Sequence, residues 1–232
     1  MKTNILLLVM ATTGLFSCRQ TSKSKPDTLD TETYNSVRNY EYADSMGNLL
    51  IIHNSGPKGG MKYTDPNGQV YVYVGWWTQI TNKTVDPIEL KIDFPIDSFE
   101  FPSSSGRYIR LLVPSDTMTV DKTSLPDFGL TVKSFLDNHR FEASSLKRTI
   151  NPRDSIAFHI VFLSKWKPIA GGSGGLRTGL TLKGQNLIYK ISAYKLTTDL
   201  PLTDKKEISF GSINLKNLIL QHRSRGTDKS KL

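Results

Sequence analysis

The sequence predicts a mostly β fold, an immunoglobulin-like or related antiparallel β-sandwich with a short helix. Two observations lead to this class, and a third concerns what stabilises it. Apolar and polar residues alternate with a period of two through much of residues 34–200, which is typical of strands with one buried face. The alternating segments are short, and turn-forming sequences separate them. The single cysteine, Cys18, permits no internal disulfide, so the fold has to be stabilised by its hydrophobic core.

The clearest alternation lies in residues 69–81 and 88–94. In residues 88–94, four apolar residues alternate with three charged ones, which predicts a strand with one face in the core and the other in water. Residues 69–81 predict a longer strand with apolar residues on both faces. One face carries Val70, Val72, Val74, Trp76 and Ile80, and the other carries Tyr71, Tyr73 and Trp77.

Four further segments are rich in β-branched and aromatic residues and predict strands. They are residues 107–113, 155–163, 176–183 and 187–194. The sequences Asp65-Pro66-Asn67-Gly68 and Gly184-Gln185-Asn186 predict turns. Residues 114–120 and 152–158 share the pattern Pro-x-Asp-Ser/Thr-apolar-x-apolar, which predicts a turn leading into a strand. Residues 130–140 predict the short helix.

The N-terminus has the order of an export signal. Lys2 precedes an apolar run over residues 5–16, which is shorter than the roughly 20 residues that a membrane-spanning helix needs. The sequence Leu15-Phe16-Ser17-Cys18 resembles the lipobox of bacterial lipoproteins, in which a small residue precedes an invariant cysteine. The resemblance implies a diacylglyceryl thioether on Cys18 and cleavage after Ser17 by signal peptidase II. An ordinary secretory signal with an incidental thiol is the alternative.

We therefore expect four regions along the chain. They are a signal peptide (1–17), a lipidated cysteine with a flexible tether (18–33), the β-sandwich (34–200) and a C-terminal extension with a basic disordered tail (201–232). The tether carries Arg19, Lys23 and Lys25 in place of the acidic cluster found in surface-exported lipoproteins of Bacteroidota. This difference favours a cell-envelope location at the outer membrane, with the protein facing the periplasm.

No motif for catalysis or metal binding satisfies its structural context. Residues 171–175 match the G-x-S-x-G elbow of α/β-hydrolases, but that elbow needs a strand before Ser173 and a helix after it, whereas a strand is predicted after it. The four histidines lack ligand spacing, and His159 is predicted to be a core or interface residue. We therefore expect no cofactor and no metal. A hydrolase site assembled only in the fold is an alternative.

Adjacent tryptophans give the sequence its one concrete binding hypothesis. Trp76 and Trp77 must point to opposite faces of a strand, so one of them lies outside the core. With Tyr71 and Tyr73, that residue forms either an exposed aromatic strip or a face that a loop covers. An exposed strip would stack on sugar rings, as in carbohydrate-binding modules. Buried aromatic residues are commoner, which favours the covered face.

The chain is basic, with 30 Lys and Arg residues against 21 Asp and Glu residues and a formal net charge of +9. Export argues against nucleic acid as the partner. Anionic lipid headgroups, lipopolysaccharide or another acidic envelope surface are the available counter-charges, and an evenly solvated surface explains the excess equally well.

Two further resemblances concern exported proteins of Bacteroidota. Four Asp-Ser/Thr-aliphatic sequences are similar to the O-glycosylation acceptor of these proteins, and the two that predicted turns do not explain make Thr28 and Ser45 candidate sites. Residues 42–60, followed by the predicted hairpin and the strand pair through residue 95, resemble a domain of uncharacterised Bacteroidota lipoproteins, and this likeness transfers no functional residue. We expect a membrane-anchored envelope lipoprotein that acts as a non-catalytic binding or scaffolding module for an envelope protein or glycan.

Overall fold

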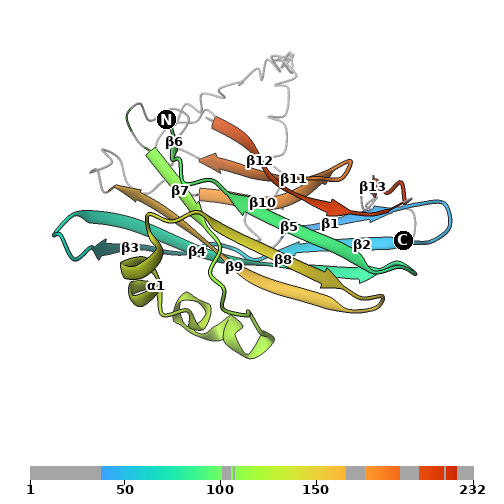
Figure 1. Ribbon diagram of the computed structural model, residues 1–232, viewed down its shortest axis with the longest axis horizontal. Coiled ribbons are helices and arrows are strands. Elements are labelled where there is room, and N and C mark those ends of the chain that lie inside the picture. Colours follow the sequence, from blue (N-terminus) through green and yellow to red (C-terminus); the bar gives the residue numbers. More distant parts are fainter. Residues whose placement is uncertain are drawn as a thin grey trace, which may run out of the picture. The chain divides into compact units, whose positions relative to one another are not determined.

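The computed structural model of this chain describes residues 38–100, 106, 108–165, 176–193, 204–216 and 218–223. It confirms the mostly antiparallel β class, with two facing sheets and a short α-helix (Figure 1). The immunoglobulin-like subclass stays a prediction. The signal peptide, Cys18, Thr28 and the tether lie outside the described residues, as do Ser173 and the end of the C-terminal tail.

The first sheet has eight strands in the order β13-β1-β2-β4-β9-β7-β6, and β3 pairs with the free half of β4. Its long central strand, β4, pairs with β3 through Val70–Gly75 and with β2 through Thr78–Lys83. The strands are β1 (Arg38–Ala43), β2 (Leu49–Asn54), β3 (Lys58–Thr64), β4 (Val70–Lys83), β6 (Phe99–Glu100), β7 (Tyr108–Leu112), β9 (Ser155–Lys165) and β13 (Gln221–Arg223).

The second sheet has five strands in the order β10-β11-β12-β5-β8. They are β5 (Ile88–Phe94), β8 (Ser144–Ile150), β10 (Leu176–Lys183), β11 (Asn186–Ala193) and β12 (Asp204–Asn214). The predicted end of the sandwich at residue 200 is wrong. β12 is the middle strand of this sheet and β13 pairs with β1, so residues assigned to a C-terminal extension belong to the sandwich.

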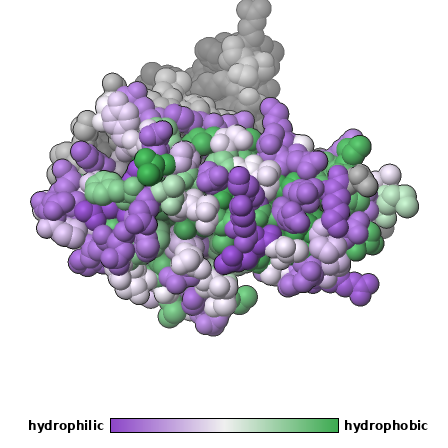
Figure 2. All heavy atoms as spheres, in the orientation of Figure 1, coloured by the Kyte–Doolittle hydropathy of each residue, from purple (hydrophilic) through white to green (hydrophobic). Residues whose placement is uncertain are grey.

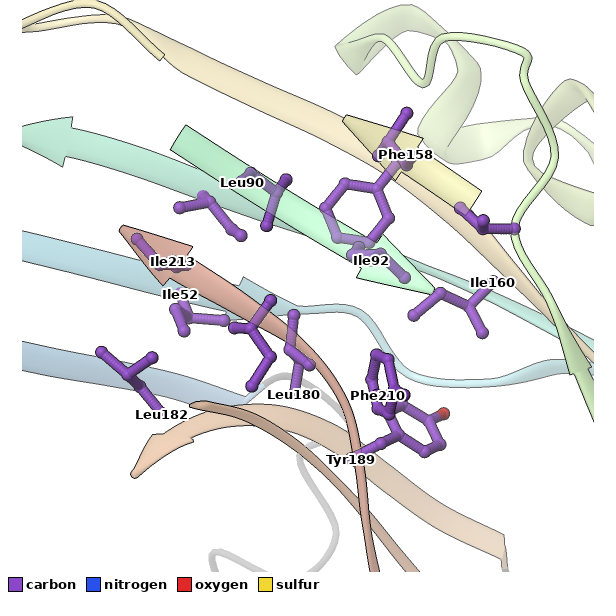
Figure 3. Packing of buried hydrophobic residues seen from close by; sticks show 14 of the residues in the cluster. Ile52, Leu90, Ile92, Phe158, Ile160, Leu180, Leu182, Tyr189, Phe210 and Ile213 are labelled. Atoms are coloured by element: carbon purple, nitrogen blue, oxygen red, sulfur yellow. The ribbon is translucent and has the colours of Figure 1, made fainter. Parts of the chain in front are cut away.

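The hydrophobic core fills the space between the two sheets. Trp76 of β4 is fully buried there, and its ring stacks on Tyr189 of β11 with centroids 5.4 Å apart. Figure 3 shows side chains from both sheets pointing toward one another, among them Ile52, Phe158 and Ile160 from the first sheet and Leu90, Leu180 and Tyr189 from the second. Burial of this large apolar surface is the main favourable contribution to folding.

Buried Asn54 joins the two sheets along one side of the sandwich. Its amide nitrogen donates to the carbonyl oxygen of Leu180 in β10 (3.1 Å), and its amide oxygen accepts from the Leu180 backbone N–H (2.9 Å). The same oxygen accepts a hydrogen bond from Thr78. The Tyr42 hydroxyl accepts a further hydrogen bond, from the backbone N–H of Leu182. Side chains of the first sheet thus occupy backbone groups of β10, the edge strand of the second sheet, which protects that edge from pairing with other chains.

A second buried asparagine, Asn82, organises one end of the sandwich. Its amide nitrogen donates to the carbonyl oxygens of Asp86 and Ile150, and its oxygen accepts from the backbone N–H and the hydroxyl of Thr84. These four bonds use the full capacity of the side chain. They fix the β4–β5 loop against the end of β8.

Candidate functional site

Five loops gather at one end of the sandwich, which we call the loop end. The antiparallel registers bring them together because Ala43 pairs with Leu49, Leu49 with Lys83, and Ile88 with Ile150. The loops join β1 to β2, β4 to β5, β8 to β9, β10 to β11 and β12 to β13. Loops that a rigid sandwich positions in this way are common binding elements.

A groove of about 900 Å³ lies at one side of the loop end, between the β1–β2 turn and the segment around β13. The β1–β2 turn forms one wall with Met46 and Asn48, and the segment around β13 forms the other with Ile219, His222 and Arg223. The His222 ring packs edge-on against Tyr42 of β1, with centroids 5.5 Å apart. The groove therefore combines apolar side chains with cationic and polar groups.

The β1–β2 turn is held by its own hydrogen bonds. The Asp44 carboxylate accepts from the backbone N–H groups of Met46 and Asn48 (both 2.9 Å) and from the Asn48 amide (2.7 Å). These bonds, the Asn48 side chain foremost, hold the pKa of Asp44 below its usual range. The rigid turn leaves Met46 84% exposed and Ser45 exposed. Ser45 is therefore accessible, as a glycosylation acceptor needs to be.

Two more apolar side chains project from neighbouring loops. Val85 in the β4–β5 loop is 76% exposed, and its backbone N–H donates to the side-chain oxygen of Asn48 (3.2 Å). Ile219, before β13, is 80% exposed. The sequence analysis did not identify Met46, Val85 and Ile219 as exposed apolar side chains. The one available signal was Met46, an apolar residue between the turn-forming pairs Asp44-Ser45 and Gly47-Asn48.

The four aromatic residues predicted as ligand contacts do not form an exposed strip. Trp76 lies in the core, and Trp77 lies on the opposite face, half-buried, with its ring stacked on His53 at 5.0 Å. Tyr71 and Tyr73 are buried, so the exposed strip is wrong for both of them. The alternative prediction, a face that another segment covers, is correct for Tyr71 and Tyr73.

The covering segment, which we call the cap, comprises residues 114–140. It contains the 3₁₀ turns η2 (Val120–Ser124) and η3 (Pro126–Gly129) and the helix α1 (Val132–His139), which confirms the predicted helix. Leu130, Val132 and Leu136 of the cap belong to the same buried hydrophobic cluster as both tyrosines. Hydrogen bonds attach the cap to the sheet: the Tyr73 hydroxyl donates to Asp127 and the Tyr63 hydroxyl to Asp137, both at 2.8 Å.

His159 lies beneath the cap as a structural residue. It is buried, with Nε2 3.1 Å from the carbonyl oxygen of Phe128 and Nδ1 3.4 Å from that of Asp116. Its partners are backbone groups of the cap, whereas a catalytic histidine would be oriented by a carboxylate beside a nucleophile. In the described part of the chain, no three His, Cys, Asp or Glu residues gather as a metal site would require.

The tyrosines under the cap predict a stability loss in alkali. Burial, with the hydrogen bond to Asp127, raises the pKa of Tyr73 to about 12, and burial, with the bond to Asp137, raises the pKa of Tyr63 to about 12. Unfolded tyrosine ionises near pH 10. Because the folded pKa values are raised, the stabilisation is complete below about pH 10 and is lost as the pH rises toward 12.

We expect the free energy of unfolding, measured with urea across this pH window, to fall steeply in the wild type. The double variant Tyr63→Phe/Tyr73→Phe removes two of the ionising groups and should show a shallower fall. Tyr42, whose pKa burial also raises to about 12, remains in this variant and keeps part of the dependence. If the free energy of unfolding fell equally steeply with pH in the two proteins, the assignment of the alkaline stability loss to Tyr63 and Tyr73 would be contradicted.

None of the helices in the described ranges is long and apolar enough to cross a membrane. No family model, no curated protein and no solved structure matches this chain.

Proposed function

We propose that this chain is a lipoprotein of the cell envelope, anchored through lipid on Cys18 in the outer membrane and facing the periplasm. Its sandwich acts as a non-catalytic binding or scaffolding module. The anchor is supported by the order of Lys2, the apolar run 5–16 and the Leu15-Phe16-Ser17-Cys18 sequence. Two or three acyl chains, at about 0.8 kcal/mol per buried CH₂, are sufficient for stable attachment.

The groove at the loop end is the observation that carries the binding role. It is concave, and the apolar side chains of Met46 and Ile219 stand exposed beside Arg223 at its edges. Elsewhere, three buried polar side chains hold parts of the fold together. Asn54 and Asn82 bond across strands, and the buried Asp65 carboxylate forms an ion pair with Arg140 at 3.3 Å.

A carbohydrate-binding role through the aromatic residues has weaker support. Sugar rings stack on exposed aromatic faces. Trp76, Tyr71 and Tyr73 are buried, and one face of the half-buried Trp77 ring is taken by His53. A hydrolase would have to use residues other than His159, whose two ring nitrogens face backbone carbonyl groups.

The anchoring half of this proposal is tested by expression in a Gram-negative host with globomycin, an inhibitor of signal peptidase II. We expect the native chain to accumulate as its precursor under the drug and to fractionate with membranes without it. Cys18→Ala should remain uncleaved whether or not the drug is present. Cleavage of both proteins at one site, insensitive to globomycin, would identify an ordinary secretory signal and overturn the anchor.

A further inference from the structure

Residues 119–129 of the cap, which we call the strap, are fixed at both ends and lightly packed between them. Met118 is buried before the strap, and its backbone N–H donates to the carbonyl oxygen of Ala157 in β9 (3.3 Å). Leu130 is buried after the strap, in the hydrophobic cluster that includes residues of α1. Between these ends, Phe128 is the one buried residue of the strap.

A segment that buries so little apolar surface opens at a low free-energy cost compared with the core of its domain. Figure 2 shows green side chains among white and purple ones at the lower edge of the molecule, where Figure 1 places the coiled turns of the cap. The contacts that keep the strap on the sheet are therefore mostly polar.

Lys58 of β3 makes the largest number of these polar contacts. Its ammonium group donates to the carbonyl oxygens of Thr123 and Leu125, at 2.8 and 3.1 Å. The same ammonium group lies 4.2 Å from the centre of the Phe128 ring. Hydrogen bonds from a charged donor are stronger than those between neutral groups, so Lys58 is the main attachment of the strap.

Two further donors come from the neighbouring strands β4 and β9. The Tyr73 hydroxyl donates to the Asp127 carboxylate at 2.8 Å, and Nε2 of His159 lies 3.1 Å from the carbonyl oxygen of Phe128. A carbonyl oxygen can only accept, so Nε2 of His159 carries the proton in this contact. Oxygen atoms of the strap thus occupy donors from three adjacent strands of the sheet.

The backbone of the strap is strained while these contacts hold. Phe128 has φ 55° and ψ 35°, and Asp127 before it has φ 47° and ψ 26°, both in the left-handed region. Aspartate tolerates this region, whereas a bulky residue such as phenylalanine is a genuine outlier there. Detachment would let Phe128 relax to a right-handed conformation, which favours opening.

The polar contacts oppose opening less than their number suggests. When the strap detaches, water bonds to its oxygen atoms and to the freed donors, so the net contribution of each hydrogen bond is modest. Opening exposes one large apolar ring and releases backbone strain. It leaves Met118, Leu130 and the core between the sheets in place.

We propose that the strap is an autoinhibitory contact that detaches as a unit from the folded sandwich. In the closed state its oxygen atoms occupy the donors of Lys58, Tyr73 and His159. In the open state these three donors are free on one face of β3, β4 and β9. This inference goes beyond the proposed function and does not depend on it, because neither the anchor nor the groove includes the strap.

Gly75 of β4 is a suitable position for a reporter beneath the strap. It lies directly opposite Lys58 in the β3–β4 pair and on the same face of the sheet as Tyr73. The turn η3 lies against both strands. Gly75 is buried, and a Cβ added there would meet no heavy atom within 4 Å, so a cysteine fits.

The test measures how fast a single thiol reacts with N-ethylmaleimide in the full chain with Cys18→Ala, in which an introduced cysteine is the only thiol. Gly75→Cys reports on the strap, Ile80→Cys on the core, and Met61→Cys on an exposed position of β3. We expect Gly75→Cys to react at least about tenfold more slowly than Met61→Cys and about a hundredfold faster than Ile80→Cys. Its rate should depend little on urea, because opening of the strap exposes little surface.

A latch variant tests the contacts that hold the strap. Lys58→Met should raise the labelling rate of Gly75→Cys about tenfold and leave that of Ile80→Cys within about twofold. Lys147→Met is the matched control, because Lys147 lies exposed in β8, away from the strap, and it should change neither rate.

Three outcomes would overturn the proposal. Labelling of Gly75→Cys with the rate and urea dependence of Ile80→Cys would mean that the strap opens only when the whole domain unfolds. Labelling as fast as Met61→Cys would mean that the strap does not cover Gly75. An unchanged rate in Lys58→Met would mean that Lys58 does not hold the strap.

Amide hydrogen exchange in the unsubstituted chain is an independent readout that needs no cysteine. The N–H groups of Leu125 and Phe128 form hydrogen bonds within the strap, and that of Phe135 forms one within α1. We expect the two strap amides to exchange at the same opening free energy and faster than Phe135. Exchange of all three at the free energy of global unfolding would contradict a strap that opens by itself.

Discussion

Replacing Trp76 by alanine should lower the free energy of unfolding by about 4 kcal/mol, whereas the same change at the adjacent Trp77 should cost about 1 kcal/mol. Trp76 is fully buried between the sheets and stacks on Tyr189. Its removal leaves a large cavity that the two sheets can close only partly. Trp77 lies on the opposite face, where it is half-buried and contacts His53. Part of its surface already meets solvent, so less is lost.

This pair is best measured by urea unfolding followed by far-UV circular dichroism, because each variant removes a fluorescent residue. Trp77→Ala is the matched control, since it deletes the same side chain one position along the same strand. Equal destabilisation of the two variants, or a larger loss for Trp77→Ala, would show that the two faces of β4 are assigned the wrong way round.

Replacing Asn54 by leucine should cost about 3 kcal/mol although the volume of the side chain is nearly kept. The change leaves the backbone N–H and carbonyl of Leu180 without their partners, and the Thr78 hydroxyl loses its acceptor. A buried polar group left unsatisfied costs about 1–3 kcal/mol, so the loss comes from unmet hydrogen bonds rather than from a cavity.

Asn39→Leu is the control for this prediction, because Asn39 lies exposed on the neighbouring strand β1, and its replacement should change stability by about 0.5 kcal/mol or less. Hydrogen exchange gives an independent readout. We expect the Leu180 amide to exchange much faster in Asn54→Leu than in the wild type, and no change in Asn39→Leu. An unchanged rate at Leu180 would mean that Asn54 does not bridge the sheets.

The strands that the sequence predicts best are those in which apolar residues recur at every second position. β5 and β10 have the predicted bounds, and β4, β7, β9 and β11 agree to within two residues at each end. The unpredicted strands lack this pattern. β2 is almost continuously apolar, β3 begins with two glycines after Lys58, and β8 is a mostly polar edge strand. For these segments, the neighbouring strands decide the structure rather than local alternation.

The candidate site depends on contacts that no local pattern contains. The groove forms because β13 pairs with β1 across most of the chain length, which brings Ile219 and Arg223 beside Met46. Alternation correctly separated the two faces of β4, since Trp76 and Trp77 do point in opposite directions. It could not show that the cap lies over Tyr71 and Tyr73, because that coverage is a tertiary contact between β4 and residues more than fifty positions away.

The central claim is that this sandwich is held at a membrane through Cys18, and the intact mass of the mature protein tests it most directly. The full chain is expressed in a Gram-negative host and extracted from membranes. Its intact mass is then compared with that of Cys18→Ala. The account predicts a chain that begins at Cys18 and carries a diacylglyceryl group, commonly with one further acyl chain, and no such mass in the variant. A mature protein that begins at another residue, or that carries an unmodified Cys18, would contradict it.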